Sequence, residues 1–315
     1  MVSNMNKNIK LITYNIDGLT DKIDLNDLPW ILKPIAWVYK LIKGTTIIKV
    51  NDNVNVSENI NKISKYLNDF EFDIIGVQED FNYHDNLMNS LKTNYNDSTF
   101  INGLDLKHIF SCVSWLPYPR LKADGINLIS KKSKVTVKNE QIIKWKNSYG
   151  YFTHANDKLT KKGFRFYTLT IDGEFDLDVY IVHMDADYYN PVTCNNVDKD
   201  IEARKKQLIQ LNSYIIDSKT NNPIIIMGDT NSTNNYSWDV ENITKYLLEP
   251  LNSTGNLEIG EAIPTNRTDV DRLFYVNNTK SNYNVKLNTC YYDIENVIGL
   301  SDHFPFITEL ILEKK

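Results

Sequence analysis

The chain has 315 residues, which is enough for one large domain or two ordinary ones with a substantial core. A hydrophobic fraction of 42% and a charged fraction of 24% are those of an ordinary globular protein. The net charge of −5 argues against the strongly basic surface of a duplex-DNA-binding protein, and three widely spaced cysteines argue against a disulfide framework or a zinc knuckle.

The segment before the first predicted strand has no apolar stretch of the kind found in a secretory signal. The longest apolar segment, residues 28–44, is interrupted by Lys33, Pro34 and Lys40, and it falls short of the roughly 20 apolar residues that a spanning helix needs. We therefore expect no transmembrane segment and a cytoplasmic or peripheral membrane location, with secretion left open.

The first part of the chain alternates predicted strands and helices. Residues 9–16 (IKLITYNI) alternate apolar and polar side chains, as a half-buried strand does, and Asp17 then begins a turn. Residues 57–70 place apolar side chains at helical spacing behind Ser57, a candidate N-cap. The apolar run at 72–79 predicts the next strand.

The remainder of the chain is rich in predicted strands. Residues 165–171 and 176–184 are joined around Asp172 and Gly173, which predicts a hairpin, and apolar residues at helical spacing predict a helix at 200–217. Further strands are predicted at 125–131, 223–231, 271–277 and 303–312. No linker divides the chain, so we expect one α/β domain over 1–315 with mixed sheets and an insertion at 28–44.

Polar side chains stand at the ends of several predicted strands. They are Asn15, Glu79, His183, Asp229 with Asn231, and Asp302 with His303. Burying a lone carboxylate or imidazole costs roughly several kcal/mol unless it is paired, so the strands themselves do not explain these residues. If each strand delivers its polar end to the same edge of a sheet, the residues form a site there.

These segments, in this order, resemble the motif series of the endonuclease/exonuclease/phosphatase superfamily, which has the DNase I-like fold. The resemblance covers nearly the whole chain, and five short motifs in order are far more specific than any one of them. It implies an α/β sandwich of two mixed β-sheets flanked by helices. It also implies hydrolysis of phosphoester bonds with a divalent metal, usually Mg²⁺, with Mn²⁺ as an alternative.

The residue types suit that chemistry. Mg²⁺ prefers carboxylate and amide oxygens and often takes only one or two protein carboxylates, a role that Glu79 and Asn15 fit. His303 is the candidate base that activates a water, because histidine titrates near neutrality. Either Asp302 or Asp271 could accept a hydrogen bond from His303 and fix its tautomer.

The resemblance assigns further roles around the phosphate. Asp229 and Asn231 would position the attacking water and the phosphate, and His183 would donate to the phosphoryl oxygens as negative charge builds. A lone histidine is usually a surface or satisfied core residue, but its place in the motif series favours function at His183 and His303. Taken alone, Glu79 would more often be a solvated residue at a strand end, and Asn15 a capping residue.

Two segments are most similar to neutral sphingomyelinases within the superfamily. The string NDKLTKKGF places Asp157 five residues before Lys162, like a regulatory or substrate-gating element of those enzymes, although a polar hairpin loop is the simple alternative. VHMDAD is similar to their histidine segment, with Asp185 where a glutamine is usual. AP endonucleases usually lack a histidine at position 183, and the inositol polyphosphate phosphatase pattern around the GDTN segment is not matched.

A lipid substrate would give the 28–44 insertion a purpose. If residues 34–43 are helical, one face is apolar and the other carries lysines, as in a helix that lies in a membrane interface; packing against the sheet is the alternative. The residues of this candidate membrane contact are Trp30, Ile35, Trp37, Val38 and Leu41. Residues 110–120 (FSCVSWLPYPR) are a second candidate.

The sequence thus predicts a Mg²⁺-dependent phosphodiesterase that hydrolyses sphingomyelin to ceramide and phosphocholine. A DNase I-like endonuclease is the alternative, as is another phosphoesterase such as a phosphoinositide phosphatase. The expected partner is a phospholipid substrate at a membrane surface, with nucleic acid a weaker expectation and no protein partner evident.

Overall fold

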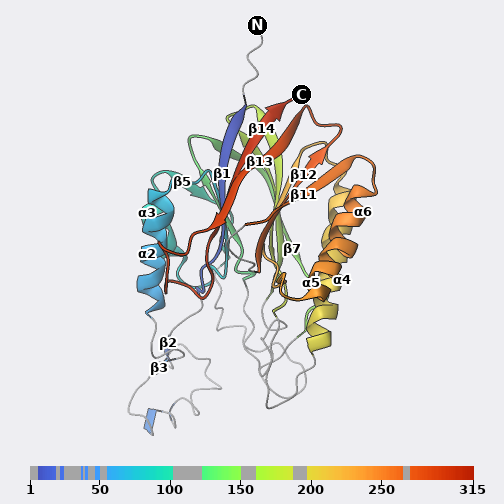
Figure 1. Ribbon diagram of the computed structural model, residues 1–315. Coiled ribbons are helices and arrows are strands. Elements are labelled where there is room, and N and C mark those ends of the chain that lie inside the picture. Colours follow the sequence, from blue (N-terminus) through green and yellow to red (C-terminus); the bar gives the residue numbers. More distant parts are fainter. Residues whose placement is uncertain are drawn as a thin grey trace.

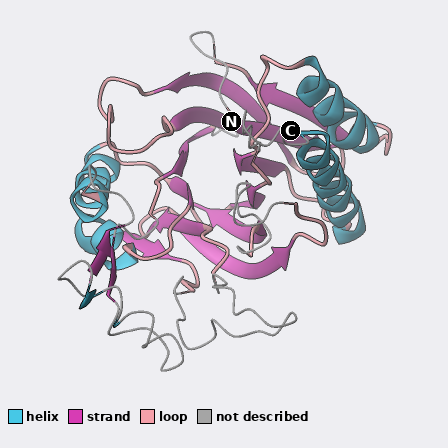
Figure 2. Ribbon diagram, turned by 90° about the horizontal axis from the view of Figure 1, so that it is seen from below, coloured by secondary structure: helices cyan, strands magenta, loops and turns pink. Residues whose placement is uncertain are grey.

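In the computed structural model of the protein, two six-stranded β-sheets pack face to face, and helices cover their outer faces (Figure 1). The structure describes residues 6–18, 22–24, 37, 40–41, 47–49, 55–101, 123–149, 161–186, 197–264 and 270–315. Seen from below, the helices flank the strands on opposite sides (Figure 2). The predicted α/β sandwich of two mixed sheets is confirmed.

The strands of each sheet follow a mixed order. In sheet 1 the order is β13 (Tyr283–Tyr292), β14 (Phe306–Lys314), β1 (Lys7–Asn15), β4 (Ile74–Gln78), β6 (Asn127–Lys131) and β5 (Tyr95–Asp97). In sheet 2 it is β11 (Leu257–Ala262), β12 (Asp271–Asn278), β10 (Ile224–Asp229), β9 (Phe175–His183), β8 (Gly163–Ile171) and β7 (Val135–Lys144). The described short strands β2 (Lys22–Asp24) and β3 (Ile47–Lys49) pair separately.

Strand direction brings distant segments to one edge of the sandwich. In sheet 1, β1 is parallel to β4, with Asn15 opposite Gln78, and antiparallel to β14. In sheet 2, β10 is parallel to β9 and antiparallel to β12, so that Asp229 lies opposite both His183 and Asp271. The ends of β1, β4, β9 and β10 therefore meet the starts of β12 and β14.

The central strands are buried on both faces, which explains their nearly continuous apolar sequences. Along β1, Leu11 packs between the sheets while Ile12 packs toward the helices on the other side. Along β10, Met227 packs between the sheets and Ile226 against the helices of sheet 2. The chain thus builds one core between the sheets and one beneath each helical layer.

The helices form the two outer layers. Sheet 1 is covered by α2 (Val56–Asp69) and α3 (His84–Leu91). Sheet 2 is covered by α4 (Val197–Ser218), α5 (Ser237–Ile243), the π-helical turn η4 (Thr244–Leu248) and α6 (Glu249–Asn252). None of the described helices combines the length and the apolar character needed to cross a bilayer.

The first helix begins earlier than the sequence suggested. Asn55, not Ser57, is the N-cap of α2, and its side-chain oxygen accepts a hydrogen bond from the Glu58 backbone amide at 3.2 Å. This satisfies one of the amides that the first turn of a helix leaves without an intrahelical partner. The predicted hairpin is present as β8 and β9, which pair through Ile171 and Phe175.

Gly228 lets β10 pass close to β9 just before Asp229. Its φ is +140°, and a Cβ there would lie 2.1 Å from the Val182 carbonyl oxygen, which is a backbone atom that cannot move aside. Gly173, in the β8–β9 turn, also has positive φ (+69°), but a Cβ there would meet nothing within 4 Å.

We expect Gly228→Ala to lower the free energy of unfolding by about 3–5 kcal/mol, because it adds a backbone clash to an unfavourable φ. Gly173→Ala, the matched control, should cost about 1 kcal/mol from φ alone. Urea unfolding followed by circular dichroism measures both. Equal losses for the two variants would show that the approach of β10 to β9 at Gly228 is not tight.

Candidate active site

Six polar side chains meet where the strand ends converge. They are Asn15 at the end of β1, Glu79 just after β4, His183 at the end of β9, Asp229 at the end of β10, Asp271 at the start of β12, and His303 shortly before β14. The first, second and last belong to sheet 1, and the others belong to sheet 2. The convergence expected from the sequence is therefore present in the fold.

Asn15 and Asp229 join the two halves of this site. The Asn15 amide donates from Nδ2 to Glu79 Oε1 and to Asp229 Oδ2, each at 3.2 Å. The same nitrogen is 3.5 Å from His303 Nε2. Asn15 and Asp229 are each only 1% exposed, so this contact between sheets is shielded from water.

Asp271, rather than Asp302, orients His303. The His303 Nδ1 atom lies 2.7 Å from Asp271 Oδ2, whereas Asp302 is exposed and accepts a hydrogen bond from the Ser301 hydroxyl. Ser301 also donates to the Asn15 carbonyl at 2.7 Å and accepts from the His303 backbone amide at 3.1 Å. Of the two aspartates that the sequence left open, Asp271 is the one that contacts the His303 ring.

The carboxylates around His303 favour its charged form. Burial alone would lower the pKa of His303, but the negative charges of Asp271, Asp229 and Asp302 outweigh burial and raise the pKa to about 11. Burial likewise opposes ionisation of Asp229, yet the nearby positive charge on His303 holds the pKa of Asp229 below its usual value. Without a metal, His303 and Asp229 therefore form a charged pair.

The surroundings of His183 favour its neutral form, in contrast to those of His303. The His183 side chain is 1% exposed, and its Nε2 atom is 3.5 Å from Asp229 Oδ2 and 3.9 Å from Glu79 Oε1. The backbone carbonyl of His183 accepts a hydrogen bond from the Trp145 indole at 2.7 Å. Burial, followed by the Lys162 charge, lowers the pKa of His183 well below its ordinary value. Its Nδ1 has no hydrogen-bond partner among the described residues, so the neutral ring carries its proton on Nε2.

Asn231 completes the Asp229 side of the site. Its backbone amide donates to Asp229 Oδ1 at 2.8 Å, and its side-chain amide donates to the Met184 carbonyl at 2.9 Å. Its φ of +48° is left-handed, as are those of Asp17 and Glu79 at +46° and +60°. Non-glycine residues rarely adopt this conformation, and its clustering at strand ends is typical of a functional site.

Glu79 and Asn15 fit a divalent metal. Burial raises the pKa of Glu79 to about 7, although the Lys162 charge and the Asn15 hydrogen bond oppose this, so the carboxylate would gain from a bound cation. In the described ranges no three His, Cys, Asp or Glu side chains are arranged to enclose a metal. Mg²⁺ commonly takes one or two protein carboxylates plus water and substrate oxygens, so a sparse donor set suits it.

Several residues of the site carry no strong signal in the sequence. Asp17 follows Asn15 closely, and burial with the Asp302 charge raises the pKa of Asp17 to about 6. Tyr292 donates from its hydroxyl to the Asp271 carbonyl at 2.6 Å. Ser301 and Trp145 each donate a hydrogen bond to the backbone carbonyl of a site residue, Asn15 and His183 respectively. In the sequence, only Ser301 has a signal, which is its position next to Asp302 and His303.

Lys162 lies close to the site, and most of the other singled-out residues lie outside the described ranges. Its side chain is buried, and its ammonium donates to the Met184 carbonyl at 3.2 Å. Asp157, Trp30, Ile35, Val38 and the segment 110–120 lie outside the described residues. Trp37 and Leu41 are described and exposed.

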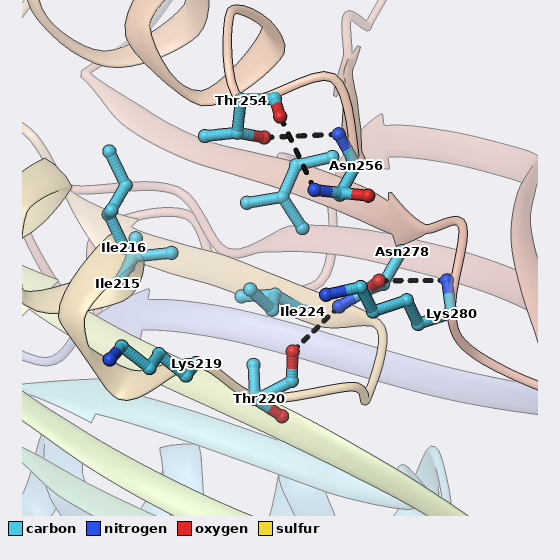
Figure 3. Close-up of a pocket in the computed structure, with 10 residues that line it drawn as sticks. Ile215, Ile216, Lys219, Thr220, Ile224, Thr254, Asn256, Asn278 and Lys280 are labelled. Carbon is cyan, nitrogen blue, oxygen red and sulfur yellow. Dashed lines mark hydrogen bonds between the residues drawn. The ribbon is translucent and has the colours of Figure 1, made fainter.

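A pocket of about 270 Å³ lies at the far end of sheet 2 (Figure 3). Ile215 and Ile224 line it, with Lys219 and Lys280 nearby. Ile224 begins β10, whereas Asp229 ends it, so the pocket and the polar cluster are at opposite ends of the same strand. The pocket is therefore separate from the candidate active site.

Known structures of the same architecture match almost the whole chain. A sphingomyelinase C from Streptomyces griseocarneus is 14% identical with a TM-score of 0.58, covering 98% of this chain and 100% of that one. A beta toxin variant from Staphylococcus aureus with bound magnesium ions gives the same values. D. rerio TDP2 complexed with a single-strand DNA product is 13% identical with a TM-score of 0.59, covering 96% and 98%.

These likenesses establish the fold. No curated protein sequence matches the chain. The sequence profile of the Endonuclease/Exonuclease/phosphatase family matches residues 12–303, a span that includes every strand-end residue from Asn15 to His303. The chain belongs to the endonuclease/exonuclease/phosphatase family.

Proposed function

We propose that this protein is a Mg²⁺-dependent phosphodiesterase that hydrolyses sphingomyelin to ceramide and phosphocholine. The observation that carries the proposal is the His303–Asp271 pair, at 2.7 Å, beside the half-buried Glu79 and the buried Asn15. The likeness to the Streptomyces sphingomyelinase C over the whole of both chains supports the choice of lipid. The histidine segment around His183 and the Lys162 segment, with Asp157 as its regulatory partner, support it further.

His303 is the general base in this proposal. Asp271 accepts a hydrogen bond from His303 Nδ1–H and so directs Nε2 toward Asn15 and Asp229. There a water would attack phosphorus in line with the leaving group. A divalent cation held by Glu79 and Asn15 would supply positive charge that offsets the phosphate and favours neutral imidazole at His303. His303 then takes the proton of the attacking water on Nε2. The P–O bond to ceramide breaks as the new P–O bond forms, and the ceramide oxygen takes up a proton from solvent.

The other side chains act on the phosphate and the water. Neutral His183, protonated on Nε2, donates to a phosphoryl oxygen as negative charge develops. Asp229 and Asn231 hold the water and the phosphate in position. Asp302 adds negative charge near His303 from the exposed side of the site.

A nuclease of the DNase I type is the second candidate. The likeness to TDP2 bound to single-strand DNA favours it as much as the overall fold favours a lipid phosphodiesterase. The same six side chains would serve either phosphodiester. The two candidates differ in substrate, so a direct comparison of substrates distinguishes them.

We expect His303→Ala to lower sphingomyelin hydrolysis by about 10²–10⁴-fold, which is the usual contribution of a general base. Asp271→Asn should also lower it strongly, whereas Asp302→Asn should stay within severalfold because its carboxylate does not contact the ring. Phosphocholine release from vesicles, with Mg²⁺ or with EDTA, measures the effect. Plasmid DNA is assayed in parallel with each variant.

Two results of these assays decide the substrate, and a third tests the role of Asp271. Metal- and His303-dependent phosphocholine release with intact DNA supports the lipid phosphodiesterase. Nicked plasmid with untouched vesicles makes the protein a nuclease. A loss in Asp302→Asn as large as that in Asp271→Asn would contradict the assignment of Asp271 as the orienting residue.

The charge state of His303 can be measured without substrate. In metal-free protein we expect its imidazole to remain protonated at pH 7 and to titrate near pH 11. Asp271→Asn removes the charge that contributes most to raising the pKa, so titration should move to lower pH. Imidazole proton shifts in NMR spectra, assigned by loss of the signal in His303→Gln, would report this; an unchanged midpoint in Asp271→Asn would refute the pairing.

Glu79→Gln should weaken Mg²⁺ binding by at least about tenfold, because it removes the half-buried carboxylate that the cation would neutralise. Glu241→Gln, an exposed carboxylate of α5, is the matched control and should leave affinity unchanged. Isothermal titration calorimetry gives the affinity without turnover. Equal affinities for Glu79→Gln and wild type would place the metal elsewhere.

A further inference from the structure

Exposed apolar side chains surround the end of the sandwich that carries the site. Tyr236 and Trp238, at the start of α5, are 45% and 40% exposed, and their rings stack with centroids 4.5 Å apart. Ile263 is exposed where β11 ends, and Ile298 is 73% exposed in the loop before His303. We call Tyr236, Trp238, Ile263 and Ile298 the apolar rim.

The rim lies on both sides of the site. Tyr236 follows Asn231 by five residues on the sheet 2 side, and Ile298 precedes His303 by five residues on the sheet 1 side. Beside Ile298, Val297 is buried among the residues between sheet 1 and α2, which fixes the loop and leaves Ile298 in solvent. In Figure 1, α5 lies beside α4, toward the lower end of the helical layer on sheet 2.

The aromatic pair is held firmly relative to the catalytic residues. The buried Asp239 carboxylate accepts from the Thr233 amide at 3.0 Å and from Arg204 at 3.1 Å. Arg272, next to Asp271 in sequence, donates to the Ser232 carbonyl at 3.0 Å. These contacts fix both ends of the segment that carries Tyr236, so its ring and that of Trp238 are presented to solvent from a rigid support.

The charge of these segments limits what can cover the rim. Residues 230–244 and 292–303 contain no lysine or arginine, and the chain carries a net charge of −5. A nucleic acid or an anionic bilayer is held mainly by lysine and arginine, so neither fits. Tyr236 and Trp238, with Ser237 between them and Asn235 before them, suit the boundary between headgroups and acyl chains of a zwitterionic bilayer.

We propose that the apolar rim contacts the surface of a zwitterionic phospholipid bilayer and thereby sets the opening of the active site against the headgroups. This rests on the proposed function, since it names the surface on which that same site would act. The contact is independent of the 28–44 segment. It also predicts that added anionic lipid weakens binding, because the net charge of −5 repels it and the segments 230–244 and 292–303 offer no cation to attract it.

The test measures binding and chemistry separately. Tyr236→Ser/Trp238→Ser is compared with wild type and with Ile216→Ser, which changes a residue of α4 that is 39% exposed and lies at the far pocket. Binding to sphingomyelin/phosphatidylcholine vesicles is measured by flotation in EDTA, which stops turnover. We expect the double variant to bind about tenfold more weakly, and Ile216→Ser to bind like wild type.

A soluble chromogenic phosphodiester, assayed with Mg²⁺, verifies that the variants are folded and active. Unchanged turnover of this substrate with weakened vesicle binding supports the rim. Equal vesicle binding by the double variant and wild type, or an equal loss in Ile216→Ser, overturns it. Loss of affinity for a single-stranded oligonucleotide with vesicle binding intact would also overturn it, since the rings would then stack on bases.

Failure of this inference can be told from failure of the proposed function. If wild type hydrolyses sphingomyelin and the double variant binds vesicles equally well, the function stands and the rim contact falls. If wild type binds vesicles through the rim but releases no phosphocholine, the contact stands and the sphingomyelinase activity falls.

Discussion

The hydrogen bond from Asn15 to Asp229 joins the central strands of the two sheets, and the rest of the site depends on it. Asp229 is buried, and an unpaired carboxylate in that position would cost several kcal/mol in rough terms. The amide of Asn15, the backbone amide of Asn231 and the charge of His303 together make its ionised form acceptable. Removing any one of these three groups would therefore change both the charge of Asp229 and the relative positions of the site residues on the two sheets.

The same cluster gives two histidines different properties. His183 is enclosed and near the positive charge of Lys162, so it stays neutral and can donate a hydrogen bond from Nε2. His303 is near three carboxylates and holds a second proton until positive charge enters the site. A neutral hydrogen-bond donor, His183, and a potential proton acceptor, His303, thus lie 3.5 and 3.9 Å from the same Asp229 Oδ2 atom, an arrangement that the proposed hydrolysis would use.

Much of this arrangement could be predicted from the sequence, because the central strands are buried on both faces and end in polar residues. The edge strands β5, β7, β11 and β13 were missed, since few of their residues are fully buried and they lack the long apolar runs of the central strands. Motif order indicated His303 and Asp271, but only the antiparallel pairing of β10 with β12 places Asp271 beside the ring. Trp145 could not be found from sequence because it acts on a backbone carbonyl.

Strand β14 lies between β1 and β13, so the first strand of sheet 1 pairs with the last. Asn15 and His303 are roughly 290 residues apart, and ribosomes add about 5–20 residues per second, so tens of seconds separate their synthesis. During that interval β1 must wait without its antiparallel neighbour, with an apolar face open to aggregation or to a chaperone. If His303 acts as the base that we propose, no hydrolysis can occur on the ribosome before His303 has been made, close to the end of synthesis.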